Sequence, residues 1–210
     1  MKSNNLILIL VIVLIVLSLF NVFVVLKGIS EAKEKFTGYA LGYLNVSIQS
    51  SLSINLSRAS INWSSGIINA SSKNATLYTR GDSTAVVERG NWSVQGTKGF
   101  ILENIGNINS SLSLQTTKNA HDFFNSLSNS NEQFMWNVSN KEPDSCSGGA
   151  SLGQWQDVNK TSGGTKYCGQ FSFNRNKNEI YIDLLLTVPS DSGYVGELSD
   201  TITITGDVAG

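Results

Sequence analysis

The sequence predicts a mainly β protein: an antiparallel β-sandwich of Ig-like or jelly-roll type, preceded by one N-terminal transmembrane α-helix. Three observations predict it. An apolar run near the N-terminus carries no charge, several later segments alternate apolar and polar residues, and small polar residues dominate the remainder. Of the 210 residues, 30 are Ser, 22 Asn, 19 Gly and 13 Thr, whereas only 15 are Lys or Arg and 16 are Asp or Glu. This composition is typical of an exported β-protein and unlike that of a cytosolic enzyme.

The apolar run covers residues 6–26, follows a short polar tail at residues 1–5, and is interrupted only by Ser18 and Asn21. As a helix these 21 residues span about 31 Å, which matches the ~30 Å hydrocarbon core of a bilayer. A secretory signal has a shorter apolar stretch. We therefore expect the helix to contact the lipid bilayer as a retained anchor, with a signal that is cleaved after the run as the alternative.

The lysines around this helix conflict with the orientation that we predict. Lys2 precedes the helix, while Lys27, Lys33 and Lys35 follow it, so the positive-inside rule places the C-terminal domain in the cytoplasm. The glycosylation motifs and the cysteine pair favour the opposite side. We therefore predict a single-pass protein of the cell membrane with an extracytoplasmic C-terminal domain. The net charge of −1 offers no electrostatic reason to bind nucleic acid.

The β domain is expected at residues 44–210, after a juxtamembrane helix or stalk at residues 27–43. Its first strand is predicted at residues 44–56, where Leu44, Val46 and Ile48 begin a period-two alternation that continues to Leu56. A C-terminal hairpin is predicted from the alternating residues 179–188 and the Thr/Ile run at residues 200–205. One short helix is expected at residues 119–127. The other predicted strands are residues 75–79, 85–88, 99–104, 111–117, 133–139 and 166–173.

Two features favour the cell exterior. Cys146 and Cys168 are the only cysteines and flank a Gly/Ser-rich loop, so we predict a disulfide, with two buried free thiols as the alternative. Asn-x-Ser/Thr motifs for N-glycosylation mark surface loops of exported proteins, and nine occur here, about twice the number expected by chance. The candidate glycosylation sites are Asn45, Asn55, Asn62, Asn69, Asn74, Asn91, Asn109, Asn137 and Asn159.

The chain also resembles a known group of surface proteins. The apolar N-terminus, the segment 100–107 (FILENIGN) and the ending Val188-Pro189, Gly196 and residues 201–205 (TITIT) are similar to anchored or secreted prokaryotic β-sandwiches of the camelysin/TasA kind and to archaeal pilin-like proteins. The resemblance covers the strands from about Gly99 onward. It implies a fibre subunit or surface protein and transfers no catalytic residue. The long apolar helix departs from that group, whose signals are shorter and cleaved.

The residue types leave little basis for catalysis. His121 is the only histidine, and with one cysteine pair it makes a zinc site or a hydrolytic triad unexpected. The paired glycines lack the downstream Lys of a phosphate-binding loop. We therefore expect no catalytic residue, metal or cofactor. Residues 80–82 (Arg-Gly-Asp) are interpreted as a turn between two strands. Of the four tryptophans, Trp155 is the one expected to be exposed and to face a ligand.

These observations predict a membrane-anchored cell-surface structural or adhesive protein. A more specific hypothesis is a pilin-like subunit that self-associates into filaments or a surface layer, through the apolar helix or by donating the strand at residues 44–56. The alternative is a carbohydrate- or partner-binding surface module. A surface hydrolase is the less favoured third class.

Overall fold

The computed structural model describes residues 3–35, 47–127, 132–149, 152–194 and 196–209. The chain forms two compact units, Met1–Ile48 and Gln49–Gly210. Each unit is described by itself.

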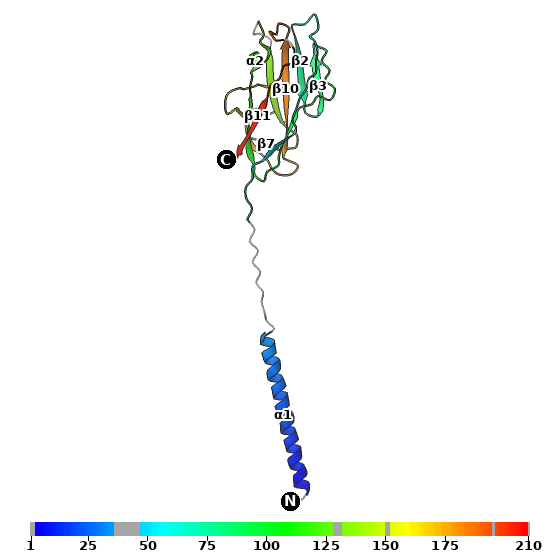
Figure 1. The fold of residues 1–210 in the computed structure, drawn as a ribbon, viewed down its shortest axis with the longest axis vertical. Helices are drawn as coiled ribbons and strands as arrows, with labels where there is room; N and C mark the ends of the chain where they lie inside the picture. The colour runs from blue at the N-terminus through cyan, green and yellow to red at the C-terminus, as the bar shows by residue number, and fades with distance from the viewer. Residues whose placement is uncertain (1–2, 36–46, 128–131, 150–151, 195, 210) are drawn as a thin grey trace. The chain divides into compact units, whose positions relative to one another are not determined.

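The first unit contains one helix, α1 (Ser3–Lys35) (Figure 1). Its segment Leu8–Lys27 is long and apolar enough to cross a membrane, and its described side chains are exposed. An uncleaved anchor and a signal sequence both fit this helix. The prediction of an apolar helix over residues 6–26 is confirmed, and the helix continues into the predicted juxtamembrane segment as far as Lys35. Residues 36–43 of that segment lie outside the described residues, as does the sequon at Asn45.

The second unit is an antiparallel β-sandwich, as predicted (Figure 1). Within the described residues, sheet 1 has the order β1–β4–β10–β2–β3, with β6 and β8 on the other side of β10, and sheet 2 has the order β11–β5–β9–β7. The strands of sheet 1 are β1 (Ile54–Arg58), β2 (Asn74–Arg80), β3 (Ser83–Glu88), β4 (Phe100–Asn104), β6 (Gln133–Asn140), β8 (Gln156–Asp157) and β10 (Glu179–Pro189). Those of sheet 2 are β5 (Ser110–Thr116), β7 (Cys146–Ser147), β9 (Thr165–Phe171) and β11 (Ile202–Val208).

The core lies between the two sheets. Alternate residues of β10 and β6 point inward, so that Ile180, Ile182, Trp136 and Val138 are buried against Leu112 and other residues of sheet 2. The short helix α2 (Ala120–Phe124) adds two buried phenylalanines to this core. Asn119 caps the helix by accepting a hydrogen bond from the Asp122 backbone N–H (2.8 Å). This short helix was predicted at residues 119–127.

Strand β10 is the centre of sheet 1 and determines where a site can form. On one edge it pairs with β6 from Ile180 to Thr187. On the other edge it pairs first with β4, over residues 179–182, and then with β2, over residues 185–189. The two pairings stop on either side of Asp183 and Leu184, so sheet 1 divides at this point into a β4–β1 branch and a β2–β3 branch.

Two predictions about strands are wrong. The first strand does not run over residues 44–56, because residues 47–53 are not in a strand and β1 begins at Ile54. Residues 49–53 instead contact the β4–β5 turn through bonds such as that from the Ile105 N–H to the Ser53 oxygen (3.0 Å). Nor do the two C-terminal strands form a hairpin, because β10 lies in sheet 1 and β11 pairs with β5 in sheet 2. Ile202 and Ile204 nevertheless pack on the predicted core.

Candidate functional site: a polar hollow on the outer face of sheet 1

A hollow of about 610 Å³ lies on the outer face of sheet 1, where the sheet divides. We call it the Trp155 hollow. Its lining comes from the end of β2 and the β2–β3 turn, from β6, from β10, and from the loop that precedes β8. The lining residues are Tyr78, Thr79, Arg80, Gly81, Asp82, Ser83, Asn137, Ser139, Asn140, Trp155, Tyr181 and Asp183. Polar groups dominate this set, which includes two carboxylates and three aromatic side chains beside amides and hydroxyls.

The β2–β3 turn forms one wall of the hollow. Strands β2 and β3 pair as far as Arg80 and Ser83, so Gly81 and Asp82 are the two turn residues. Gly81 has φ +53°, which suits glycine at the first position of a two-residue hairpin turn. The Tyr181 ring packs over it, with a ring carbon 3.1 Å from where a Cβ at Gly81 would lie. The prediction that residues 80–82 form a turn between two strands is confirmed.

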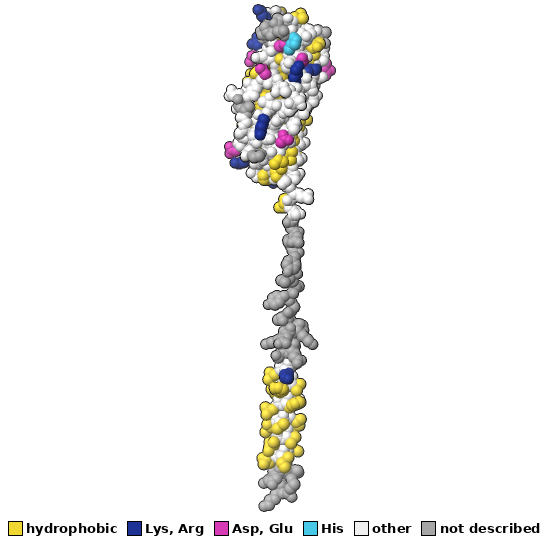
Figure 2. Space-filling view, turned by 90° about the vertical axis from the view of Figure 1, so that its left-hand side faces the viewer, with side chains coloured by type: hydrophobic (Ala, Val, Ile, Leu, Met, Phe, Trp, Pro, Cys, Tyr) yellow, Lys and Arg dark blue, Asp and Glu magenta, His cyan; other side chains and the backbone are white. Residues whose placement is uncertain are grey.

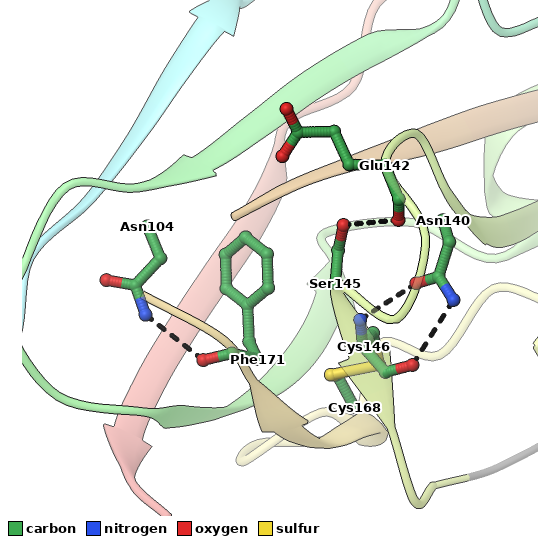
Figure 3. The surroundings of a disulfide bond; sticks show 7 residues. All are labelled: Asn104, Asn140, Glu142, Ser145, Cys146, Cys168 and Phe171. Carbon is green, nitrogen blue, oxygen red and sulfur yellow. Dashed lines mark hydrogen bonds between the residues drawn. A yellow bond between two sulfur atoms is a disulfide. The ribbon is translucent and has the colours of Figure 1, made fainter. Parts of the chain in front are cut away.

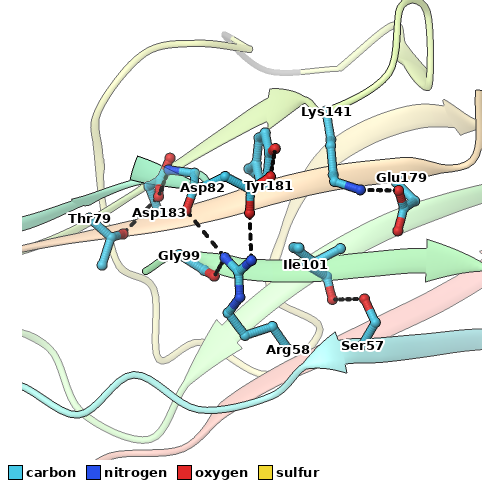
Figure 4. A network of polar contacts seen from close by, with 11 residues as sticks. Ser57, Arg58, Thr79, Asp82, Gly99, Ile101, Lys141, Glu179, Tyr181 and Asp183 are labelled. Atoms are coloured by element: carbon cyan, nitrogen blue, oxygen red, sulfur yellow. Dashed lines mark hydrogen bonds and ion pairs between the residues drawn. The ribbon is translucent and has the colours of Figure 1, made fainter. Parts of the chain in front are cut away.

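Asp82 is held in place by two side chains (Figure 4). Its carboxylate oxygens accept hydrogen bonds from the Tyr181 hydroxyl (2.5 Å) and from the Arg58 guanidinium (2.5 Å). These contacts lower the pKa of Asp82, the Tyr181 bond being the larger cause and Arg58 the second. Burial, together with the bond to Asp82, raises the pKa of Tyr181 to about 12. At neutral pH the wall therefore presents a fixed carboxylate and a neutral phenol.

Arg58 joins the two branches of sheet 1. The register of β1 against β4 shifts between Leu56 and Arg58, as at a β-bulge, a feature that can redirect a side chain. The guanidinium donates to the backbone oxygens of Gly99 (2.7 Å) and Gly81 (3.2 Å) as well as to Asp82. One cation from β1 thus bonds to the start of β4 and to the β2–β3 turn.

Asp183 lies behind this wall, where the sheet divides. Its Oδ1 accepts hydrogen bonds from the Thr79 hydroxyl (2.7 Å) and from the Gly81 N–H (2.7 Å). Thr79 Oγ1 in turn accepts from the Leu184 N–H (3.0 Å), which replaces the missing strand partner at this point. Burial raises the pKa of the Asp183 carboxyl, although both hydrogen bonds act in the opposite direction. A Cβ on Gly99 would lie 2.2 Å from the same oxygen, so only glycine fits there.

The opposite wall comes from β6 and the loop before β8. Asn137 and Ser139 alternate with core residues along β6 and therefore point to the outer face. Gln156 pairs with Trp136, which places Trp155 next to Asn137. The Oδ1 atom of Asn137 is buried and makes no hydrogen bond within the described residues. An acceptor of this kind is available to a ligand that carries a hydroxyl or an N–H group.

Trp155 lies in the chain segment between Cys146 and Cys168, whose disulfide is shown in Figure 3. The bond joins β7 to β9 in sheet 2, with Cα atoms 5.7 Å apart, and the intervening chain crosses to pair with β6 as β8. The Asn140 side chain accepts from the Cys146 N–H (2.8 Å) and donates to the Cys146 oxygen (3.3 Å). The predicted pairing of these two cysteines is present. Trp155, which we expected to be exposed, is half-buried.

The candidate glycosylation sites differ in exposure. Among the described ones, Asn55, Asn62, Asn69 and Asn91 are exposed, whereas Asn74, Asn109, Asn137 and Asn159 are half-buried. Asn137 lines the hollow in the middle of a strand. The exposed group therefore holds the better acceptors for glycosylation.

His121 lies outside the hollow, on α2, where its Nδ1 is 3.0 Å from a Glu132 carboxylate oxygen. Among the residues that the structure describes, no three His, Cys, Asp or Glu side chains gather as a metal site would require. Sequence reasoning missed Arg58, Asp82, Tyr181 and Asp183 as members of one site. The available signal was Asp183, a carboxylate inside the otherwise apolar run of residues 180–188.

Comparisons of the chain with protein-family models, with curated proteins and with solved structures found no match. The chemistry of the hollow therefore rests on its own geometry. A fixed carboxylate, an unpartnered amide oxygen, hydroxyls and an indole can bind a molecule that combines hydroxyl groups with a C–H face. The two carboxylates of the lining accept hydrogen bonds from the Thr79 and Tyr181 hydroxyls.

Proposed function

We propose that this chain is a membrane-anchored cell-surface adhesion protein whose β-sandwich binds an extracellular carbohydrate in the Trp155 hollow. The observation that carries the proposal is the pairing, across one hollow, of an aromatic side chain with fixed polar groups. Most binding sites have this plan, in which apolar surface supplies affinity and a few placed polar groups supply orientation. We assign no catalytic residue.

Sugar rings suit this lining for a physical reason. A pyranose has one face of C–H groups, which packs on an indole, and a rim of hydroxyls that both donate and accept hydrogen bonds. The Asp82 carboxylate and the Asn137 Oδ1 supply acceptors, and the Ser139 hydroxyl supplies a donor and an acceptor. Because Asp82 is already fixed by Arg58 and Tyr181, it loses little side-chain freedom when a ligand binds.

The extracytoplasmic placement is part of the same proposal. It is supported by α1, by the disulfide and by exposed sequons, since disulfides persist in oxidising compartments. Against it stands the excess of lysines after the helix. Protease treatment of intact cells tests the placement, because an exterior domain is digested from outside while a cytoplasmic one is protected.

Binding is tested with the full chain in detergent micelles on an array of neutral and acidic oligosaccharides. We expect Trp155→Ala to weaken binding at least about 30-fold, the effect of removing a central interface aromatic worth about 2 kcal/mol. Asn137→Ala should weaken it as well. The matched control is Tyr194→Ala, which removes an exposed aromatic side chain (48% exposed) from outside the hollow. If no oligosaccharide binds, or if all three variants bind like the wild type, the carbohydrate proposal is wrong.

A filament subunit is the second candidate function, and the free edge of β11 favours it. β11 ends the order of sheet 2, with β5 as its neighbour on one side, and its Thr203 and Thr205 side chains are exposed. Such an edge can pair with a second copy, and the resemblance to camelysin/TasA proteins supports the same role. Donation of residues 44–56 is not part of this proposal, because Ile54–Arg58 already pairs with β4. Filaments seen by electron microscopy should disappear in a Thr203→Lys/Thr205→Lys variant, whereas the hollow should still bind its ligand.

A further inference from the structure

One end of the sandwich carries four exposed apolar side chains from four different segments. Leu52, Ile105, Phe173 and Val208 are 36%, 55%, 39% and 66% exposed. We call this set the apolar rim. Hydrophobic side chains gather at this end of the domain in Figure 2. Contiguous exposed apolar surface is uncommon on a monomer and marks a site of contact with a protein or a membrane.

Backbone contacts bring the four segments together. The Ile105 N–H donates to the Ser53 oxygen (3.0 Å), which joins the β4–β5 turn to the segment before β1. Asn109 lies at the end of the same turn and accepts from the Phe173 N–H (3.4 Å) and, through its backbone oxygen, from the Ala209 N–H (3.1 Å). These hydrogen bonds connect the segments that carry the rim residues, so the rim is a fixed part of the folded domain.

Two cationic side chains follow the rim residue Phe173 on the β9–β10 loop. Arg175 and Lys177 are exposed and follow Phe173 closely in the sequence. Lys177 lies 3.3 Å from the Asp144 carboxylate, and Arg175 forms no ion pair with any residue that the structure describes. Aromatic and aliphatic side chains next to Arg and Lys form the composition that membrane interfaces favour, where the apolar groups enter the headgroup layer and the cations meet phosphates.

The short link between α1 and the β domain indicates which surface the rim end of the domain contacts. The compact domain begins at Gln49, within the rim end, and α1 ends at Lys35. The 13 residues between them can span at most about 45 Å, at roughly 3.4 Å per residue. If α1 spans a bilayer, the rim is the part of the domain that is tethered nearest to that bilayer, and the tether keeps the local concentration of membrane high.

We propose that the apolar rim docks on the surface of the bilayer that α1 spans. The inference rests on the proposed anchor, and it adds a second contact that fixes the domain on the membrane. The lining of the hollow includes none of the rim residues, so we expect docking to leave it open to extracellular ligands.

Site-directed spin labelling of the full chain tests this docking. Because Cys146 and Cys168 are bonded to each other, a new cysteine is the free thiol that takes the label. Labels are placed at the rim with Ile105→Cys and, separately, Phe173→Cys. The matched control is Ile67→Cys, which replaces an isoleucine with 68% exposure that lines a shallow hollow together with Val188, near the opposite end of β10. Leu17→Cys in α1 reports on the anchor itself.

Each variant is reconstituted in vesicles of phosphatidylcholine and phosphatidylglycerol, and relaxation by oxygen is compared with relaxation by a nickel chelate. Oxygen concentrates in lipid and the chelate in water, so we expect the oxygen-to-nickel ratio at both rim labels to exceed that at Ile67 at least threefold. Equal ratios at the rim and at Ile67, with Leu17 in lipid, overturn the docking and leave the anchor intact. A Leu17 label in water overturns both. Rim labels protected from oxygen and nickel alike show a protein contact instead, which also overturns the docking.

Discussion

Removing the disulfide should lower the free energy of unfolding of the sandwich by at least about 3 kcal/mol. Cys146 and Cys168 are separated by 22 positions, and closing a loop of that length removes about 3 kcal/mol of unfolded-state entropy at 25 °C. For a domain of this size, that loss corresponds to a fall in Tm of about 10 °C. Both cysteines are almost completely buried, so replacing their sulfurs by the hydrogens of alanine adds a cavity cost to the entropic one.

The assay is thermal unfolding of the full chain in detergent, followed by tryptophan fluorescence, for the wild type and for Cys146→Ala/Cys168→Ala. Reduction of the wild type removes the bond and keeps both sulfurs, so it separates the cross-link from the cavity. The double variant is its own control, since a reductant should leave its Tm unchanged. A Tm within about 2 °C of the wild type would refute the reasoning. It would show that the Asn140 bonds and the pairing of β8 with β6 already restrain this loop in the unfolded chain.

Three further predictions follow from the hollow and its surroundings. First, acid should loosen the β2–β3 turn. The pKa of Asp82 is lowered in the folded state by its hydrogen bonds to Tyr181 and Arg58. The stability that these bonds contribute is therefore present above pH ~4 and is lost as the pH falls through the folded-state pKa. Amide exchange at Gly99, whose N–H donates to the Gly81 oxygen (3.1 Å), measures this, and the pH step should be smaller in Asp82→Asn. Second, Gly99→Ala should cost about 1–3 kcal/mol, because its Cβ would meet the Asp183 carboxylate, whereas Gly206→Ala, with ordinary contacts only, should cost less; urea unfolding compares them. Third, glycopeptide mapping after secretion from a eukaryotic host should find no sugar on Asn137 and should find sugars on the exposed sequons, Asn55, Asn62, Asn69 and Asn91.

Strand positions were predictable because period-two alternation is a local property. The predicted strands at residues 75–79, 133–139 and 179–188 match β2, β6 and β10 to within a residue at most ends. The two-residue strands β7 and β8 were missed, since two residues cannot show a period. Their pairing depends on where the disulfide loop lies, which the sequence does not show.

Strand pairing was less predictable because it depends on residues far apart in the chain. Residues 44–56 alternate well, but β4 is only five residues long, and of the described residues 47–56 only those from Ile54 onward pair with it. Residues 49–53 bond instead to the β4–β5 turn, as in the bond from the Asn107 N–H to the Ser51 oxygen (3.0 Å). The expected C-terminal hairpin failed for a related reason: β10 is buried between β6 and its two partners on the opposite edge, and β11 reaches the other sheet.

Of the candidate site, only Trp155 could be predicted from the sequence as a ligand-facing residue. Trp155 could be singled out because it lies in a loop between two cysteines. Arg58, Asp82, Tyr181 and Asp183 could not be grouped, because only the division of sheet 1 beside β10 brings them together. A charged residue in an apolar strand, as Asp183 is, signals a special environment but does not name its partners.

The two walls of the hollow are held by different means. The Trp155 wall depends on a covalent bond in sheet 2 and on the pairing of β8 with β6, whereas the Asp82 wall depends on Arg58 and on the buried Asp183 carboxylate. The division of sheet 1 leaves a gap in the β10 ladder, and such a gap needs polar groups from side chains to replace backbone partners. These side chains, Thr79 and Asp183, are themselves buried, and Asp183 accepts a hydrogen bond from the Gly81 N–H, so the feature that completes the fold at Asp183 also positions the β2–β3 turn that lines the hollow.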